Sequence, residues 1–437
     1  MVEIKRRERD TIIQALRAGV VPRLGLQHIQ VGRAREIEEL VKDMERIAEG
    51  GAAIRFIIGD YGSGKTFFIN LIRLVALEKG LVVMSADLAP DRRLHATGGQ
   101  ARSLYAEMAR NCATRTKPDG GALASVVERF VSQTYRTAEE EDRSVGEVIR
   151  ERLAHLEELT GGFEFSEVVR KYWEGHETGD EDLKTSALRW LRAEFATRTD
   201  ARKALGVRTI IDDASVYDHL KLMAAFVCEA GYKGLVISLD EMVNLYKLTS
   251  SQARNANYEQ ILRILNDVLQ GSAAHLGFLF GGTPDFLMHT RRGLYSYEAL
   301  QSRLAENSFA RDGLVDLSGP VVRLANLSPE DLFVLLKNVR RVMKHEESVP
   351  NEAIEAFMHH CAARIGEAYF RTPRNTVTAF VDLLSVIEQN PGAAWQDLIE
   401  AIDIEVDGGD DLSDIEDLGS TGNAATTPDD DLSSFKL

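Results

Sequence analysis

The residues best suited to carry chemistry lie at positions 59–66, which read Gly-Asp-Tyr-Gly-Ser-Gly-Lys-Thr. This is the Gly-x-x-x-x-Gly-Lys-[Ser/Thr] pattern of a phosphate-binding loop. Its glycines let consecutive backbone N–H groups curl around phosphate oxygens, and the helix that follows points its free amides at them. Lys65 is expected to reach the β- and γ-phosphates, and the Thr66 hydroxyl to bind Mg²⁺. The pattern predicts a nucleoside triphosphate with its metal, held by Gly59, Asp60, Tyr61, Gly62, Ser63, Gly64, Lys65, Thr66 and the next residue, Phe67.

A second reactive group is the acidic pair Asp240-Glu241, which follows the apolar run 234–239. A buried strand that ends in Asp-Glu supplies the other half of a nucleotide site. We expect Asp240 to belong to the Mg²⁺ shell and Glu241 to polarise the attacking water as a general base. Because acidic pairs after apolar runs are common, this prediction depends on the phosphate-binding loop upstream.

Both groups need a parallel sheet to bring them together. The apolar run 54–58 leads into the loop, and the runs 80–87, 276–284 and 321–324 have the continuous apolar character of buried parallel strands. Helical periodicity or capping signals lie between and around these runs. The pattern predicts an α/β fold with helices at 4–18, 94–115, 255–270 and 297–304, after Arg33, after Lys65 and through Leu220–Val227.

Composition limits the class of protein. The 437 residues exceed one hydrophobic core, so two or three domains are expected. No apolar run is long enough to span a bilayer and the start lacks a signal peptide, so we expect a cytoplasmic protein without a membrane partner. Three well-separated cysteines indicate buried free thiols. Of the net charge of −16, −9 lies from Glu405 onward, which leaves a local basic groove for nucleic acid possible.

Changes in composition predict five parts. They are an N-terminal helical segment (1–30), a nucleotide-binding core (31–119 and 207–326), a charged helical insertion (120–206), a helical lid (327–406) and a disordered acidic tail (407–437). The insertion fits either a packing module or a contact for substrate or DNA. The tail fits either a solubilising segment or a docking peptide anchored by Phe435 or Leu437.

The order of these parts resembles an AAA+ ATPase, with a P-loop core, a central parallel sheet and a C-terminal helical lid. Val31-Gly32-Arg33 before a helix is similar to the element that borders adenine in the initiator and clamp-loader branch. The resemblance implies that Val31, Gly32 and Arg33 lie beside the base. It also implies that Thr283, at the end of the strand next to the Asp-Glu strand, helps to place the water. A strand-end turn before Pro284 is the alternative for Thr283.

The same resemblance assigns roles to two arginines. Arg303, at the end of the helix before the last strand, would be the arginine finger that reaches a neighbouring subunit's γ-phosphate. Arg291 and Arg292 are rivals, and a plain surface arginine is a further alternative. Arg374, after Thr372-Pro373 in the first turn of a lid helix, would contact the γ-phosphate from the same chain, and a solvated arginine at the start of a helix is the alternative. Both Ser328-Pro329 and Thr372-Pro373 read as a helix N-cap followed by proline.

A closer resemblance is to the BrxD family, the ATP-binding proteins of bacteriophage exclusion (BREX) systems. It rests on segments 15–22, 31–33, 59–67, 231–235 and 281–284 and extends over roughly residues 8 to 400. It implies ATP as the nucleotide, ATPase activity in anti-phage defence, and a partner helicase encoded with the protein, with action on DNA.

These observations leave two main functions. The first is an ATP-hydrolysing homo-oligomer that acts on DNA or remodels a partner. The second is a switch or adaptor that hydrolyses ATP slowly and recruits a helicase. A small-molecule kinase is disfavoured because Glu241 suits water activation. Candidate DNA contacts are the basic stretches 291–292 and 337–341, either of which could instead be a solvated helix face, and the lid lacks room for a winged helix that reads sequence.

Overall fold

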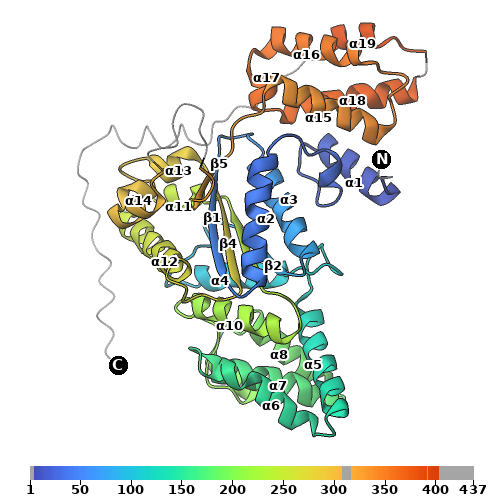
Figure 1. Cartoon of the computed structure of the whole chain (residues 1–437). Coiled ribbons are helices and arrows are strands. Elements are labelled where there is room, and N and C mark those ends of the chain that lie inside the picture. The colour runs from blue at the N-terminus through green and yellow to red at the C-terminus, as the bar shows by residue number, and fades with distance from the viewer. Residues whose placement is uncertain (1–3, 308–315, 391, 403–437) are drawn as a thin grey trace, which may run out of the picture.

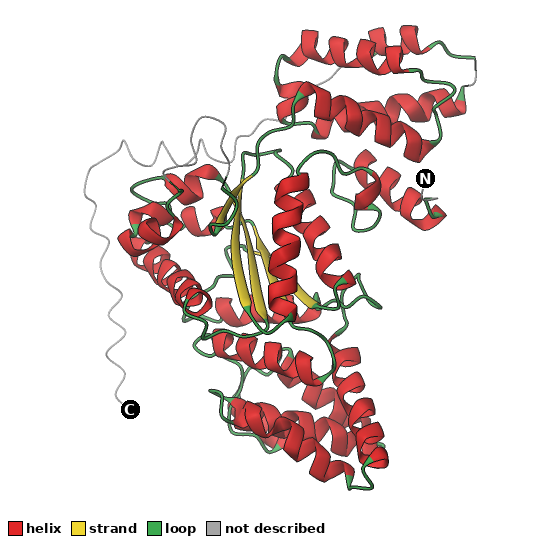
Figure 2. Ribbon diagram, viewed as in Figure 1, coloured by secondary structure: helices red, strands yellow, loops and turns green. Residues whose placement is uncertain are grey.

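We describe the protein from a computed structural model, in which residues 4–307, 316–390 and 392–402 are placed well enough to describe. The expectations for the acidic tail lie outside these residues. A five-stranded sheet forms the centre, in the order β2-β3-β4-β1-β5 (Figures 1 and 2). All its pairings are parallel, so the predicted α/β class with a central parallel sheet is confirmed. The strands are β1 Ala52–Ile58, β2 Val82–Asp87, β3 Leu235–Asp240, β4 Leu276–Gly282 and β5 Val321–Arg323.

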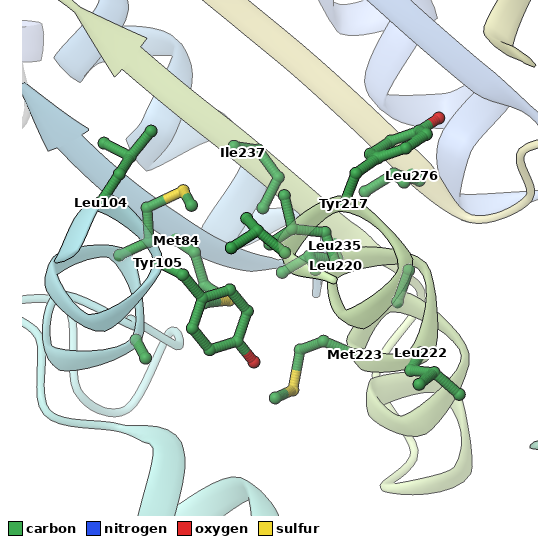
Figure 3. Packing of buried hydrophobic residues seen from close by; sticks show 14 of the residues in the cluster. Met84, Leu104, Tyr105, Tyr217, Leu220, Leu222, Met223, Leu235, Ile237 and Leu276 are labelled. Carbon is green, nitrogen blue, oxygen red and sulfur yellow. The ribbon is translucent and has the colours of Figure 1, made fainter. Parts of the chain in front are cut away.

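Helices cover both faces of the sheet, which is why its strands are mainly apolar. On one face α2 (Ala34–Ala48) and α3 (Lys65–Glu78) pack against the strands. On the other face lie α4 (Gln100–Arg110), α10 (Val216–Glu229) and α12 (Ser251–Leu269). Figure 3 shows part of this second layer, where side chains of α4 and α10 meet those of β2, β3 and β4 around Met84, Leu104, Tyr105, Leu220 and Ile237.

The helix expected over 94–115 is shorter than predicted, because α4 spans only Gln100–Arg110. Gly99, with φ of +92°, is its N-cap, so the helix begins only after the glycine pair. Beyond its end Ala113 exchanges two backbone hydrogen bonds with Val83. The backbone groups of residue 113 are therefore committed to the edge of the sheet.

The segment 120–206 is helical, without a strand, as its composition indicates. Its helices share a core with α10 that contains Phe130, Phe165 and Trp190. Figure 1 places them at the opposite end of the sheet from the C-terminal helices. They are α5 Leu123–Glu140, α6 Val145–Glu157, α7 Gly162–Thr178, α8 Glu181–Leu191 and α9 Arg198–Leu205.

The C-terminal helices form a second hydrophobic unit, and the N-terminal helix α1 (Arg6–Arg17) packs into it (Figure 1). Ile12 of α1 is fully buried in the same cluster as Leu332, Phe357 and Phe380. The helices of this lid are α15 Pro329–Met343, α16 Asn351–Ile365, α17 Ala368–Arg371, α18 Arg374–Gln389 and α19 Trp395–Ala401. Short helices complete the described chain: α11 Val243–Tyr246, α13 Pro284–Met288, α14 Glu298–Leu304 and the 3₁₀ turns Leu26–His28 and Leu294–Ser296.

The two predicted Pro-started helices differ. Ser328 caps α15, since its hydroxyl accepts the Asp331 N–H and the Asp331 carboxylate accepts the Ser328 N–H. Thr372 does not cap α18, because its hydroxyl donates to the Ala368 carbonyl (3.0 Å). Pro373 takes the cap position instead, so α18 begins one residue later than the capping pattern predicts.

All three cysteines are free thiols. Cys112 and Cys361 are buried as predicted, while Cys228 is half-buried. Of the helices in the described part of the chain, none has the length and apolar character needed to cross a membrane.

Candidate functional site

A cavity of about 730 Å³ opens where the carboxyl ends of the strands meet the lid and the N-terminal segment. Its size is that of a pocket for a small organic ligand. The phosphate-binding loop, Asp240, Glu241 and Thr283 line its sheet side. Residues 16–22, Leu335 and Arg374 line the opposite side. The insertion contributes no residue to the lining, which is consistent with its place at the far end of the sheet.

The phosphate-binding loop has the backbone geometry that its sequence predicts. Gly62 and Gly64 have φ of +77° and +82°, which other residues rarely adopt. Gly64 is the N-cap of α3, so the first amides of that helix have no partner within the helix. A Cβ at Gly62 would lie only 3.0 Å from the Cα of Thr372, which shows how closely the lid approaches the loop.

Lys65 is folded back over its own loop. Its ammonium donates to the carbonyls of Gly59 (2.9 Å) and Asp60 (2.8 Å). Burial lowers its pKa, against the opposing effects of Asp240, Glu241 and Asp60. The three carboxylates favour the protonated form of Lys65. The two carbonyls now accept the N–H bonds that the ammonium would donate to a bound phosphate.

Asp240 connects the two sequence motifs directly. Its carboxylate accepts a hydrogen bond from the Thr66 hydroxyl (2.7 Å) and another from the Glu241 N–H (2.9 Å). Asp240 is only 8% exposed, and a Cβ at Gly281 of the next strand would come within 2.2 Å of it. The hydroxyl and carboxylate oxygens are hard ligands of the kind that Mg²⁺ prefers. Among the described residues there is no group of three or more His, Cys, Asp or Glu side chains that could hold a metal.

Glu241 faces the cavity at the end of β3, in a strained backbone conformation. Its φ of +57° is uncommon for a residue other than glycine, and such strain is concentrated at functional sites. Partial burial raises its pKa, and the negative charges of Asp240 and Asp87 raise it further, against Lys65 and Lys247. Asp87 ends β2 directly beside Asp240 in the strand register. The sequence reading did not give Asp87 a role, although its place at the end of an apolar run was visible.

Thr283 lines the cavity at the end of β4, the strand next to β3. It is 6% exposed, and its hydroxyl accepts the Phe286 N–H (3.3 Å) as the N-cap of α13. The side chain therefore closes the turn before Pro284, and it also borders the cavity.

The predicted arginines lie in different places. Arg374 lines the cavity, beside Gly19 of the N-terminal segment. Arg303 is exposed and lies outside the cavity, where its guanidinium donates to Asn266 (2.8 Å) and the Ala299 carbonyl (2.8 Å). Arg292 donates to the carbonyls of Tyr246 and Leu248, whereas Arg291 is exposed.

Of the three residues expected beside the base, two line the cavity and one does not. Val31 and Arg33 line the cavity, while Gly32 faces the Asp331 carboxylate. Arg33 donates to the carbonyls of Ser63 (2.6 Å) and Ala325 (3.0 Å). The sequence reading missed the apolar wall formed by Leu16, Val20, Val21, Phe68, Leu71, Leu335 and Val377, since nothing local in these residues signals a ligand.

The site geometry agrees with the result of comparing the sequence with known families. A family model described as BREX system ATP-binding protein BrxC/D matches residues 4–403. The chain belongs to this family. Membership confirms the resemblance drawn from the motifs, supports ATP as the ligand of the cavity and implies a role in a phage-defence system. A search of curated proteins finds no match.

The BrxC/D match extends over almost all of the described chain. It includes α1, the sheet, the insertion and the whole described lid. The cavity draws on the first and last of these parts as well as on the loop, so no single segment forms it alone.

Proposed function

We propose that this BrxC/D protein is an AAA+ ATPase that hydrolyses ATP with Mg²⁺. The observation that carries the proposal is the hydrogen bond between Thr66 and Asp240, because it joins the phosphate-binding loop to the strand end that bears Glu241. The strand order supports it too. β4, which is followed by Thr283, lies between β1 and β3, so three functional strand ends meet at one edge.

In this proposal each residue has a separate task. The loop amides and Lys65 bind the phosphates, and Glu241 accepts the proton of the attacking water. Thr283 orients that water, and Arg374 contacts the γ-phosphate from the lid. Thr66 and Asp240 would hold Mg²⁺, which would neutralise part of the phosphate charge. A direct test is to measure phosphate release from ATP by the purified protein with and without Mg²⁺.

The raised pKa of Glu241 gives this reaction an expected pH dependence. As a base Glu241 must be ionised, so turnover should fall when the pH drops through its pKa. Since that pKa lies above the ordinary value of 4.5, the acid limb should begin at a higher pH than for an ordinary glutamate. The measurement is kcat/KM for ATP from about pH 4.5 to 8.5, because this ratio reports the pKa of the free enzyme. An acid limb at or below pH 4.5 would contradict the assignment.

We propose further that the protein works as a homo-oligomer in which Arg303 completes the neighbour's site. Arg303 is exposed at the end of α14 and outside its own cavity, as a residue acting in trans must be. A subunit with Arg303→Ala lacks the finger but keeps Glu241, and a Glu241→Gln subunit has the reverse defect. Mixing the two inactive variants should restore up to about a quarter of wild-type turnover, because some interfaces then combine both intact residues.

The control is Arg291→Ala mixed with Glu241→Gln. Arg291 is the remaining exposed rival, since Arg292 is bound to carbonyls of its own chain. If Arg291→Ala alone is inactive and recovers turnover in its mixture, while Arg303→Ala alone stays active, the finger is Arg291. If both variants are inactive alone and neither mixture recovers turnover, the finger lies elsewhere or the protein works as a monomer.

The target of the ATPase is proposed to be DNA or a partner helicase in phage defence. In the stretch 337–341 Arg340 is buried and donates to Val349, and Arg341 donates to His28, so Lys337 is its exposed cation. These contacts weaken that stretch as a DNA surface and leave Arg291 as the better candidate.

The alternative function, a slowly hydrolysing adaptor, is separated by measuring ATPase rate and particle size with ATP and Mg²⁺, with and without single- and double-stranded DNA. Turnover that stays absent with DNA and a partner helicase would favour the adaptor.

A further inference from the structure

The N-terminal helix and the lid form one packing unit, which we call the α1–lid unit (α1 and α15–α19). Beyond the shared apolar cluster, the Thr378 hydroxyl donates to the Leu16 carbonyl (3.0 Å). Arg17 donates to the Ser385 hydroxyl (2.6 Å) and lies 3.9 Å from the Asp382 carboxylate. Any displacement of the lid relative to the sheet would therefore carry α1 with it.

Two short linkers join the α1–lid unit to the sheet within the described chain. One is residues 30–33, which enter α2, and the other is residues 324–328, which lead from β5 to α15. In the first linker Gly32 and Arg33 have consecutive left-handed conformations, with φ of +65° and +59°. A non-glycine residue persists in this region only where its surroundings hold it.

The Arg33 side chain supplies that support and connects three segments. Its guanidinium donates to the Ser63 carbonyl of the phosphate-binding loop (2.6 Å) and to the Ala325 carbonyl of the second linker (3.0 Å). Beside it the Asn326 side chain donates to the Asp60 carboxylate of the same loop (3.1 Å). Both linkers and the loop therefore meet at one guanidinium.

The contact with Ser63 also determines where a phosphate-binding amide points. In a trans peptide the C=O and the next N–H point in opposite directions. The peptide between Ser63 and Gly64 is trans, so holding the Ser63 carbonyl on Arg33 aims the Gly64 N–H away from that guanidinium. Gly64 lines the cavity and is the N-cap of α3, where anions are favoured.

We propose that Arg33 is a positioning residue that couples the phosphate-binding loop to the placement of the α1–lid unit. This role rests on the proposed ATP site. It differs from the role expected from the sequence, because Arg33 acts through Ser63 and Ala325 rather than on the base. Phosphate binding fixes the peptides of the loop, and the Ser63 carbonyl then holds the Arg33 guanidinium in place. Because Arg33 also binds Ala325, the second linker is fixed as well. That linker sets the position of Arg374 and of the apolar wall over the cavity.

The test compares Arg33→Ala with Arg35→Ala, an exposed arginine two residues along. Amide hydrogen exchange is measured first without nucleotide. Arg33→Ala should accelerate exchange about tenfold in both 59–66 and 324–328, whereas Arg35→Ala should not. Because no nucleotide is present, this result stands even if the protein proved not to hydrolyse ATP. Unchanged exchange in Arg33→Ala would overturn the proposal.

The second measurement is the Kd for ATP with Mg²⁺ and for adenosine alone. Arg33→Ala should weaken ATP about tenfold and adenosine far less, because the misplaced groups are phosphate-binding amides. Equal weakening of both ligands would make Arg33 a base-contacting residue and overturn the proposal. Arg33→Lys keeps the charge and covers the case in which alanine prevents folding. The lysine ammonium lacks the forked guanidinium, so Arg33→Lys should also exchange faster than the wild type in both segments. Exchange at the wild-type rate would show that a positive charge alone holds the two segments.

Discussion

Replacing Glu241 with glutamine is expected to slow ATP hydrolysis by about a hundredfold or more while ATP still binds. Glutamine keeps the size of the side chain and its place at the end of β3 but cannot accept the proton of the attacking water. In the proposed site the phosphate contacts come from the loop amides and Lys65, neither of which the change alters. The measurements are kcat for phosphate release and the Kd for ATP with Mg²⁺.

The matched control is Glu78→Gln, the same isosteric change at the exposed C-terminal end of α3, where Glu78 pairs with Arg115 (3.6 Å). It should leave turnover within about twofold, since exposed ion pairs contribute little. Glu241→Gln should also melt no lower than the wild type. The folded state raises the pKa of Glu241, so it disfavours the charged form at neutral pH, and a neutral side chain relieves that cost. Wild-type turnover in Glu241→Gln would remove the catalytic base from the proposal.

The sequence predicts those parts of the site that local patterns determine. The loop at 59–66, its strand and its helix carry their signal within a few residues, because the glycines are needed by the backbone itself. The strand ends at Asp240 and Thr283 follow from apolar runs, and parallel strands place their carboxyl ends at one edge. The structure accordingly brings the loop, Asp240, Glu241 and Thr283 to one cavity.

Contacts between distant segments were not predictable in the same way. Nothing near Arg33 shows that its guanidinium would meet Ser63 and Ala325, which are separated from it by 30 and 292 positions. The packing of α1 on the lid is hidden likewise, since an amphipathic helix shows that it has a partner but not which one. Thr372 shows how tertiary structure overrides a local rule, because its hydroxyl binds the preceding turn instead of capping α18.

Replacing Lys65 with alanine is expected to weaken ATP binding by about a hundredfold, and so to abolish turnover at ordinary ATP concentrations. A charge-assisted contact with phosphate contributes about 1.5–3 kcal/mol, and one ammonium can reach two phosphates. The net contribution of Lys65 to the free energy of ATP binding is smaller than this, because its ammonium must leave the carbonyls of Gly59 and Asp60 to reach a ligand. The measurement is the Kd for ATP with Mg²⁺, by titration calorimetry.

Lys79→Ala provides the control, because it removes the same charge just beyond the other end of α3, where Lys79 pairs with Glu45 (2.6 Å). Its Kd for ATP should stay within about twofold of the wild type, since that pair is on the surface. The two lysine variants therefore separate a general loss of positive charge from the loss of a phosphate ligand. Equal affinity of Lys65→Ala and the wild type would mean that ATP binds elsewhere, and the roles given to Thr66, Asp240 and Glu241 would then fail together, because all of them depend on a phosphate held in this loop.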